Sequence, residues 1–453
     1  MKIRDRILPV IHAIVVAALL LLLSSTSLAY ALNLEVTTKF EYKSADYLNK
    51  KLTNLVKNAA PSNQGLEYFI LPDSTDLEKI PADPKNPLTH EKVQLGKLLF
   101  HETALSIHPI DKRNWKQSSC ATCHIAQAGF RSNLAQGVGV GGEGWNKSRK
   151  INREIPITAV DKQSILTPSV LNSAYQEIKM WDGRLGVAGV NEKEGLIAKA
   201  YVNRFKIDGL EAQAIDGLTF HRMGTAAIAI LPEYQELFAK AFPDRPYVGA
   251  EVEDINRSGM AIAAYERSLL ANQAPFQKWL KGDKNSMTER ELKGAIVFFG
   301  SSCVKCHTGK NLAKSDFYAV GFADHPKDYG GLNLGRGGVT KRASDDFKFK
   351  VPQLYNLGDS SPYGHGASFQ SLREVVEYFN LGEPQKLEAL YAGNISPLFL
   401  PLRLKKQQVD DLTAFLETGL RDPNLTRYLP ARIPSGQCFP NNDAISRKQL
   451  NCD

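Results

Sequence analysis

Apolar residues recur at helical spacing in two stretches of the chain, and each stretch leads into a turn that contains two cysteines. The first stretch is Leu95-Gly96-Lys97-Leu98-Leu99, whose leucines fall on one face of a helix. The second begins at Thr288-Glu289-Arg290-Glu291, which has the form of a capping box, continues over Leu292–Phe299 and ends at Gly300. The repeated order predicts two similar units in tandem.

A third amphipathic helix is predicted near the C-terminus, where Val409, Leu412, Phe415 and Leu416 share one face. Segments with strand-like alternation are few and short. We therefore predict a mainly α fold.

The two cysteine-bearing turns have the same five-residue pattern. They read Cys120-Ala121-Thr122-Cys123-His124 and Cys303-Val304-Lys305-Cys306-His307. Two thiols at this spacing form thioethers with the vinyl groups of c-type haem, and the following histidine binds the iron. The alternative is a zinc site built from the four thiolates, which leaves both histidines unexplained. The pattern predicts two covalently bound haem c groups in two tandem cytochrome c-type domains with long inserted loops, with His124 and His307 as iron ligands.

The N-terminus has the pattern of a secretory signal peptide. Three basic residues at Lys2, Arg4 and Arg6 precede a mostly apolar run over Ile7–Leu23, and Ala29-Tyr30-Ala31 is a small-x-small cleavage site. An uncleaved membrane anchor is the alternative, because the apolar run is long for a signal peptide. Since c-type haem is attached outside the bacterial cytoplasm, we expect a periplasmic protein.

The remaining cysteines and the charge add two expectations. Cys438 and Cys452 lie outside the haem motifs in a tail rich in turn residues, and in an oxidising compartment they are predicted to form a disulfide. The formal net charge of +8 comes without a dense Arg-Lys cluster, so nucleic-acid binding is not expected.

These features divide the 453 residues into five parts. The parts are a signal peptide at 1–31, an N-terminal extension at 32–90, a first haem domain at 91–284, a second haem domain at 285–425 and the tail at 426–453. The boundary between the haem domains is expected at the turn Gly282-Asp283-Lys284-Asn285, and Gly137–Gly144 is predicted to be a flexible loop over the first haem.

From Leu95 to about Leu420 the chain resembles the bacterial dihaem cytochrome c peroxidase and MauG superfamily. The resemblance rests on the haem motifs, on the opening helix with Leu105-Ser106, and on four further segments. These are Pro168–Asn172 with Trp181-Asp182-Gly183-Arg184, Glu211-Ala212-Gln213-Ala214, Val351–Asn356 and Pro362-Tyr363-Gly364-His365.

The resemblance implies that the first haem is the peroxide site and that the second collects and stores electrons. Trp181 would lie between the haems and carry electrons from one to the other, which is compatible with a role as a packed interface aromatic. Some relatives carry Gly-His-Gly-Trp with a switchable histidine ligand, where this chain has Gly142-Glu143-Gly144-Trp145, and no histidine occurs between His124 and His221. The first iron is therefore expected to have an open sixth position.

Peroxide cleavage also needs a distal group that moves a proton, ideally helped by positive charge. The superfamily places a glutamate after the segment of Gln213 that lines the peroxide pocket, but this chain reads Phe220-His221-Arg222-Met223-Gly224 there. Three interpretations stay open. His221 acts as the base with Arg222 as charge stabiliser, Glu143 swings over the haem from its glycine loop, or His221 is only a structural hydrogen-bonding residue.

At the second haem, relatives use methionine or tyrosine as the sixth ligand. Every methionine of this chain precedes His307, and the corresponding position falls on Phe379 with Tyr378 beside it, so Tyr378 is a ligand only if the helix register shifts by one. The superfamily also holds a calcium ion with an asparagine where this chain has Leu166, which makes calcium doubtful.

We therefore expect an exported dihaem c-type oxidoreductase that reduces hydrogen peroxide with electrons from a small periplasmic donor. One alternative is a MauG-like oxidase that modifies a protein or a small organic substrate. The other is an electron-transfer dihaem cytochrome without peroxide chemistry.

Overall fold

The computed structural model describes residues 45–187, 189–193, 206–244, 251–325 and 332–452. The chain divides into two units, Met1–Lys51 and Leu52–Asp453, and the first contributes only the start of helix α2 (Ala45–Ala59) to the described residues. The predicted signal peptide lies outside the described residues. Within the described ranges, none of the helices is long and apolar enough to cross a membrane.

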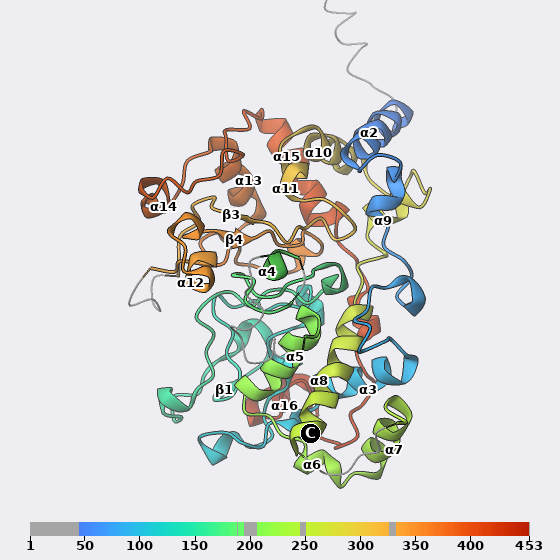
Figure 1. The fold of residues 1–453 in the computed structure, drawn as a ribbon, viewed down its shortest axis with the longest axis vertical. Helices are drawn as coiled ribbons and strands as arrows, with labels where there is room; N and C mark the ends of the chain where they lie inside the picture. The colour runs from blue at the N-terminus through green and yellow to red at the C-terminus, as the bar shows by residue number, and fades with distance from the viewer. Residues whose placement is uncertain (1–44, 188, 194–205, 245–250, 326–331, 453) are drawn as a thin grey trace, which may run out of the picture. The chain divides into compact units, whose positions relative to one another are not determined.

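The second unit is mainly helical, which confirms the predicted fold class (Figure 1). Its helices are α3 (His90–His101), α4 (Val190–Lys193), α5 (Gly209–Phe220), α6 (Ala226–Ala229), α7 (Pro232–Ala241), α8 (Glu251–Ser268), α9 (Pro275–Leu280), α10 (Glu289–Gly300), α11 (Cys303–Cys306), α12 (Arg336–Thr340), α13 (Leu372–Leu381), α14 (Leu387–Tyr391), α15 (Lys406–Ala414) and α16 (Ala444–Leu450). The strands form two antiparallel pairs, β1 (Gly142–Glu143) with β2 (Lys150–Ile151) and β3 (Phe317–Tyr318) with β4 (Phe349–Lys350).

Helix α3 leads to the first haem motif and packs against α8, which also packs against α5 (Figure 1). The predicted helix over 95–99 is thus confirmed as part of α3, and Leu95, Leu99 and Phe100 are fully buried. At the crossing, a Cβ on Gly96 would lie 1.8 Å from the Ala261 carbonyl oxygen of α8. Only glycine allows the two backbones to approach this closely, so Gly96 sets the spacing of the helices that support the first motif.

Helix α10 leads to the second motif and is built in the same way. Its predicted capping box is confirmed, because the Glu291 amide donates to Thr288 Oγ1 at 3.3 Å and the Thr288 amide donates to Glu291 Oε2 at 2.7 Å. The helix packs against α15, where a Cβ on Gly294 would lie 2.0 Å from the Asp411 carbonyl oxygen. The two helices that lead to the haem motifs, α3 and α10, therefore each cross a later helix at a glycine. This likeness supports the tandem haem domains, which stay a prediction.

The predicted C-terminal amphipathic helix is confirmed as α15, which continues into a single π-helical turn at Phe415–Gly419. Val409, Leu412, Phe415 and Leu416 are all buried, as their shared face predicts.

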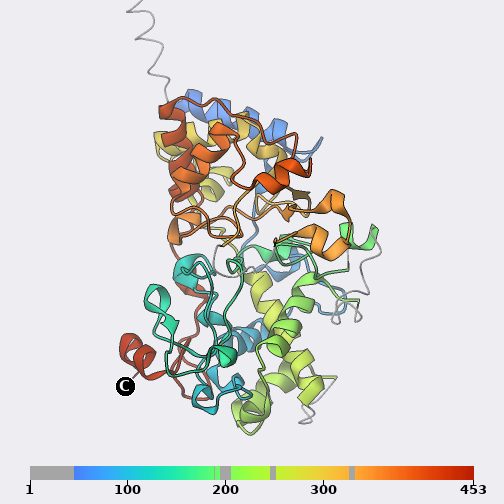
Figure 2. The same ribbon diagram turned by 90° about the vertical axis from the view of Figure 1, so that its left-hand side faces the viewer.

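The C-terminal tail lies against the first haem motif. The predicted disulfide between Cys438 and Cys452 is confirmed. Ser119, directly before the motif, donates a hydrogen bond from Oγ to the Pro440 carbonyl oxygen at 2.9 Å. Helix α16 lies beside β1, as Figures 1 and 2 show. The tail is therefore anchored largely by polar contacts to the segment that carries the first motif.

Candidate functional site

The first haem motif forms a tight turn that presents His124 to a buried cavity. The imidazole Nδ1 of His124 lies 3.2 Å from the Phe130 carbonyl oxygen, to which it donates a hydrogen bond. Burial lowers the pKa of His124 to about 4, so the ring is neutral near pH 7. A neutral ring whose proton sits on Nδ1 leaves the Nε2 lone pair available to a metal.

The second motif repeats this arrangement on α11. His307 Nδ1 donates to the Leu312 carbonyl oxygen at 3.0 Å, and burial lowers the pKa of this imidazole to about 4. Both histidines are therefore held in the tautomer that ligates iron through Nε2.

One cavity is lined by both motifs, with contributions from Cys120, Cys123, Cys303 and Cys306 as well as both histidines. None of these four cysteines forms a disulfide. Among the described residues, no cluster of three or more His, Cys, Asp or Glu side chains could hold a metal ion. The four-thiolate zinc site is therefore wrong, and the paired thiols and imidazoles fit two covalently attached haem groups.

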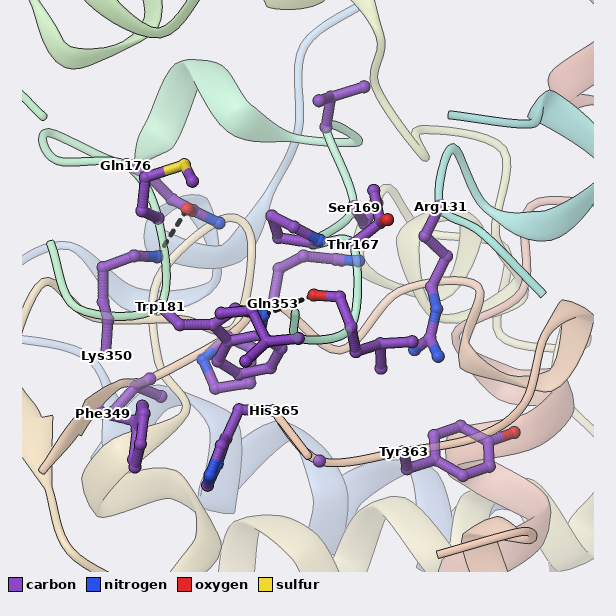
Figure 3. Close-up of a pocket in the computed structure, with 18 of the residues that line it drawn as sticks. Arg131, Thr167, Ser169, Gln176, Trp181, Phe349, Lys350, Gln353, Tyr363 and His365 are labelled. Carbon is purple, nitrogen blue, oxygen red and sulfur yellow. Dashed lines mark hydrogen bonds between the residues drawn. The ribbon is translucent and has the colours of Figure 1, made fainter. Parts of the chain in front are cut away.

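Buried cations in the cavity wall also fit haem, whose propionates are anionic. Arg131 donates to the Pro362 carbonyl oxygen, and Lys350 donates from Nζ to Gln176 Oε1 at 2.8 Å; neither pairs with a carboxylate of the described chain. Burial lowers the pKa of Arg131 to about 10 and that of Lys350 to about 8. Figure 3 shows these two side chains at opposite sides of the close-up. Buried cations normally have an anionic partner, and haem propionates suit this role.

Trp181 lies in the wall of the cavity (Figure 3), and its place between the haems, which the resemblance implies, stays a prediction. Its indole Nε1 donates to the Leu166 carbonyl oxygen at 2.8 Å, and its own carbonyl oxygen accepts from the Lys350 amide at 2.8 Å. The indole meets His365 edge-on at 6.3 Å between ring centroids, and His365 stacks on Phe349 at 3.6 Å. The indole is therefore held by its hydrogen bond to Leu166, and His365 and Phe349 form a row of aromatic rings beside it.

The distal candidates near the first motif come from α5. Gln213, Gly217 and His221 line the cavity at successive turns of this helix, as the resemblance implied for the segment of Gln213. The Oε1 atom of Gln213 is buried and makes no hydrogen bond within the described chain. His221 caps the end of α5 and faces the same cavity as His124.

Asp161 holds the two residues that follow the helix. His221 Nδ1 lies 3.4 Å from Asp161 Oδ2, and the Arg222 guanidinium pairs with Asp161 Oδ1. Arg222 is absent from the cavity wall. The guanidinium is turned toward Asp161, and its role as a charge stabiliser stays a prediction. Asp161 was not predicted from the sequence, because it lies 60 positions from His221 and belongs to no recognisable motif.

Glu143, the alternative distal group, does not line the cavity in this structure, and its movement over the haem stays a prediction. Glu143 lies in β1 opposite Lys150, and its carboxylate pairs with the Lys150 ammonium at 3.3 Å rather than lining the cavity. The predicted flexible loop is likewise packed. The Gly139 amide donates to the Asp161 carbonyl oxygen at 2.8 Å, and most of Gly137–Gly144 is buried.

Near the second motif, α13 turns an apolar face to the cavity. Leu372, Val375, Val376 and Phe379 line it at helical spacing. Tyr378 lies on another face, where its hydroxyl donates to the Val320 carbonyl oxygen at 2.5 Å. In this register Phe379 lines the cavity and Tyr378 does not, so ligation of the second haem by Tyr378 would still require the register shift.

Leu166, at the position of the superfamily's calcium-binding asparagine, is buried and donates its amide to the His365 carbonyl oxygen at 2.9 Å. Its side chain offers no oxygen ligand, so calcium remains doubtful.

Comparisons with known proteins agree with this geometry. A family model described as di-haem cytochrome c peroxidase matches residues 90–285. The chain is 29% identical over 363 residues to cytochrome c551 peroxidase of Nitrosomonas europaea, covering 80% of this chain and 89% of the relative. It is 28% identical over 361 residues to the methylamine utilization protein MauG of Methylophilus methylotrophus, covering 78% and 88%. The chain is therefore similar to members of the dihaem cytochrome c peroxidase and MauG superfamily, in agreement with its two haem motifs.

The fold is also found in a solved structure. A MauG-like protein associated with microbial copper homeostasis superposes with a TM-score of 0.55 at 24% identity, covering 78% of this chain and 95% of that one. The chain is thus similar to dihaem oxidoreductases, and both of its haem motifs line the cavity described above.

Proposed function

We propose that this protein is a periplasmic dihaem c-type oxidoreductase that reduces hydrogen peroxide at the first haem, with electrons relayed through the second. The observation that carries the proposal is the position of His221. It faces the cavity of the first motif from the end of α5, while Glu143, at the place of a switchable ligand, points elsewhere.

Cys120, Cys123 and His124 would hold the first haem, and Cys303, Cys306 and His307 the second. Bound haem supplies an iron that accepts peroxide oxygen and stores electrons. The protein supplies the binding, orientation and proton transfer.

His221 would move the proton. With Nδ1 directed at Asp161, its Nε2 can accept a proton from peroxide and return it to the oxygen that leaves as water. Gln213, one side of whose amide is buried without a partner, would orient the peroxide by hydrogen bonding. The complete reaction joins one peroxide, two protons and two electrons to give two waters.

A MauG-like oxidase is the second candidate, and the apolar face of α13 favours it. Phe379 lines the cavity, and the resemblance implies a ligating methionine or tyrosine at its position. A haem without methionine ligation has a lower potential, which favours highly oxidised states that could act on a protein or an organic substrate.

Steady-state turnover with hydrogen peroxide and a reduced small c-type cytochrome tests the proposal and separates it from the alternatives. We expect two cytochromes to be oxidised per peroxide consumed. Trp181→Phe should slow this turnover by about tenfold or more, because the indole and its hydrogen bond to Leu166 are lost.

The control for Trp181→Phe is the first reaction of the resting protein with peroxide, followed at the Soret band, which should keep the parent rate. If the parent protein consumes peroxide without oxidising the cytochrome, the result would favour a MauG-like oxidase. If it consumes none, an electron carrier is the better description. Unchanged turnover in Trp181→Phe would remove this ring from the electron path.

A further inference from the structure

Asp161 contacts both His221 and Arg222, the two residues in the segment where the superfamily has its distal glutamate. His221 Nδ1 and the Arg222 guanidinium contact its two different oxygens. We infer that Asp161 is the positioning residue of the distal site, holding His221 with Nε2 toward the first haem while Arg222 pairs with its other oxygen. The inference rests on the proposed peroxide reaction at the first haem.

The backbone of Asp161 is fixed from the side of the glycine loop. Its amide donates to the Val140 carbonyl oxygen and its carbonyl oxygen accepts from the Gly139 amide, both at 2.8 Å. Buried Arg149 braces this loop from behind, donating to the Gly139 carbonyl oxygen at 2.6 Å and pairing with Asp443 of the tail at 3.4 Å. Asp161 therefore sits on a rigid support, as a positioning residue requires.

The chemistry of the contact decides the tautomer of His221. An ionised carboxylate only accepts hydrogen bonds, so the proton of a neutral imidazole beside it belongs on Nδ1. Nε2 then carries the lone pair that can take a proton in the cavity. Although burial opposes ionisation, the hydrogen bonds from His221 and Arg222 hold the pKa of Asp161 below its usual range.

The chain reversal after α5 makes the shared contact possible. Arg222 adopts a left-handed backbone conformation with φ of 55°, and its carbonyl oxygen accepts from the His108 amide at 3.3 Å. This turn brings two successive side chains to the same carboxylate. The positive charge of Arg222 is thus paired with Asp161.

The test compares reactions that need proton removal with one that does not. Hydrogen peroxide and HCN must both lose a proton as they bind ferric haem, whereas CO binds ferrous haem without proton transfer. We expect Asp161→Ala and the isosteric Asp161→Asn to slow the peroxide and HCN reactions of the holoprotein by about 10–100-fold and to leave CO binding within about twofold. Asp161→Asn should also be slow, because an amide offers one acceptor to two donors.

Asp216→Asn is the matched control, since this carboxylate on α5 lies close enough to His221 for a charge interaction but makes no hydrogen bond to it in the described structure. It should keep all three rates within about twofold. Arg222→Ala should slow the peroxide reaction less than His221→Ala does.

Parent-like peroxide and HCN rates in both Asp161 variants, with a slow His221→Ala, would overturn the inference and leave the proposed function standing. If His221→Ala is also unaffected, the proposed distal role fails and the inference fails with it. Equal slowing of CO binding in Asp161→Asn would show a general loss of pocket structure and would likewise overturn the positioning role.

Discussion

Replacing His221 with alanine is expected to slow the reaction of the resting protein with hydrogen peroxide by about 10²–10⁴-fold, the usual contribution of a positioned acid–base group. The imidazole lines the cavity that His124 enters, and Asp161 directs its Nδ1 away from that cavity. Alanine leaves no group there that can both take and return a proton. Stopped-flow mixing with peroxide, read at the Soret band, measures the rate.

Glu143→Gln is the control for this substitution. It removes the other acid–base candidate, but its carboxylate pairs with Lys150 outside the cavity wall, so the peroxide rate should stay within about twofold of the parent. A parent-like peroxide rate in His221→Ala together with a strongly slowed peroxide reaction in Glu143→Gln would reverse the assignment of the two residues.

Loss of covalent haem is the second large effect. Cys120→Ala and Cys303→Ala each remove one thioether and the two-thiol geometry of one motif, so each variant should lose most of the covalent haem at that site. Haem staining of the denatured polypeptide should fall to about half of the parent value, since two equivalent motifs carry the haem.

The remaining cysteines provide a matched control for haem content. Cys438 and Cys452 form the disulfide of the tail and lie outside both motifs. The double variant Cys438→Ser, Cys452→Ser should retain covalent haem at both sites. Haem that extracts completely from the parent protein into acid acetone would contradict covalent attachment altogether.

The helices that lead to the haem motifs could be predicted because their signals are local. The capping box at Thr288 and the leucines of α3 lie within a few residues of the structure that they specify. The haem motifs are equally local, since two thiols and an imidazole on one turn are enough to state the chemistry. The apolar face of α15 also extends into its π-helical turn.

The arrangement around His221 could not be predicted, because it depends on a contact across 60 positions. No spacing in the sequence links Asp161 to the end of α5, so the pairing of the Arg222 guanidinium with this carboxylate could not be predicted. The packing of the glycine loop Gly137–Gly144 could not be predicted for the same reason. Its glycines indicate mobility, but Arg149 and the tail residue Asp443 hold it from outside the segment.

The choice between Tyr378 and Phe379 shows how one residue of helical register changes an assignment. The two are adjacent in sequence, but about 100° of rotation separates neighbouring side chains on a helix. The structure directs Phe379 to the cavity and Tyr378 to the Val320 carbonyl oxygen. Only tertiary packing decides which of the two faces the haem.

The central claim, that the first haem has an open coordination position, is tested most directly by electron paramagnetic resonance of the resting ferric protein at neutral pH. The account predicts a high-spin ferric signal. This signal should respond to substitution of His221, which faces the first motif, and be insensitive to Phe379→Leu at the second. Two low-spin haems in the resting protein would contradict it, because a protein ligand would then close the position that peroxide must enter.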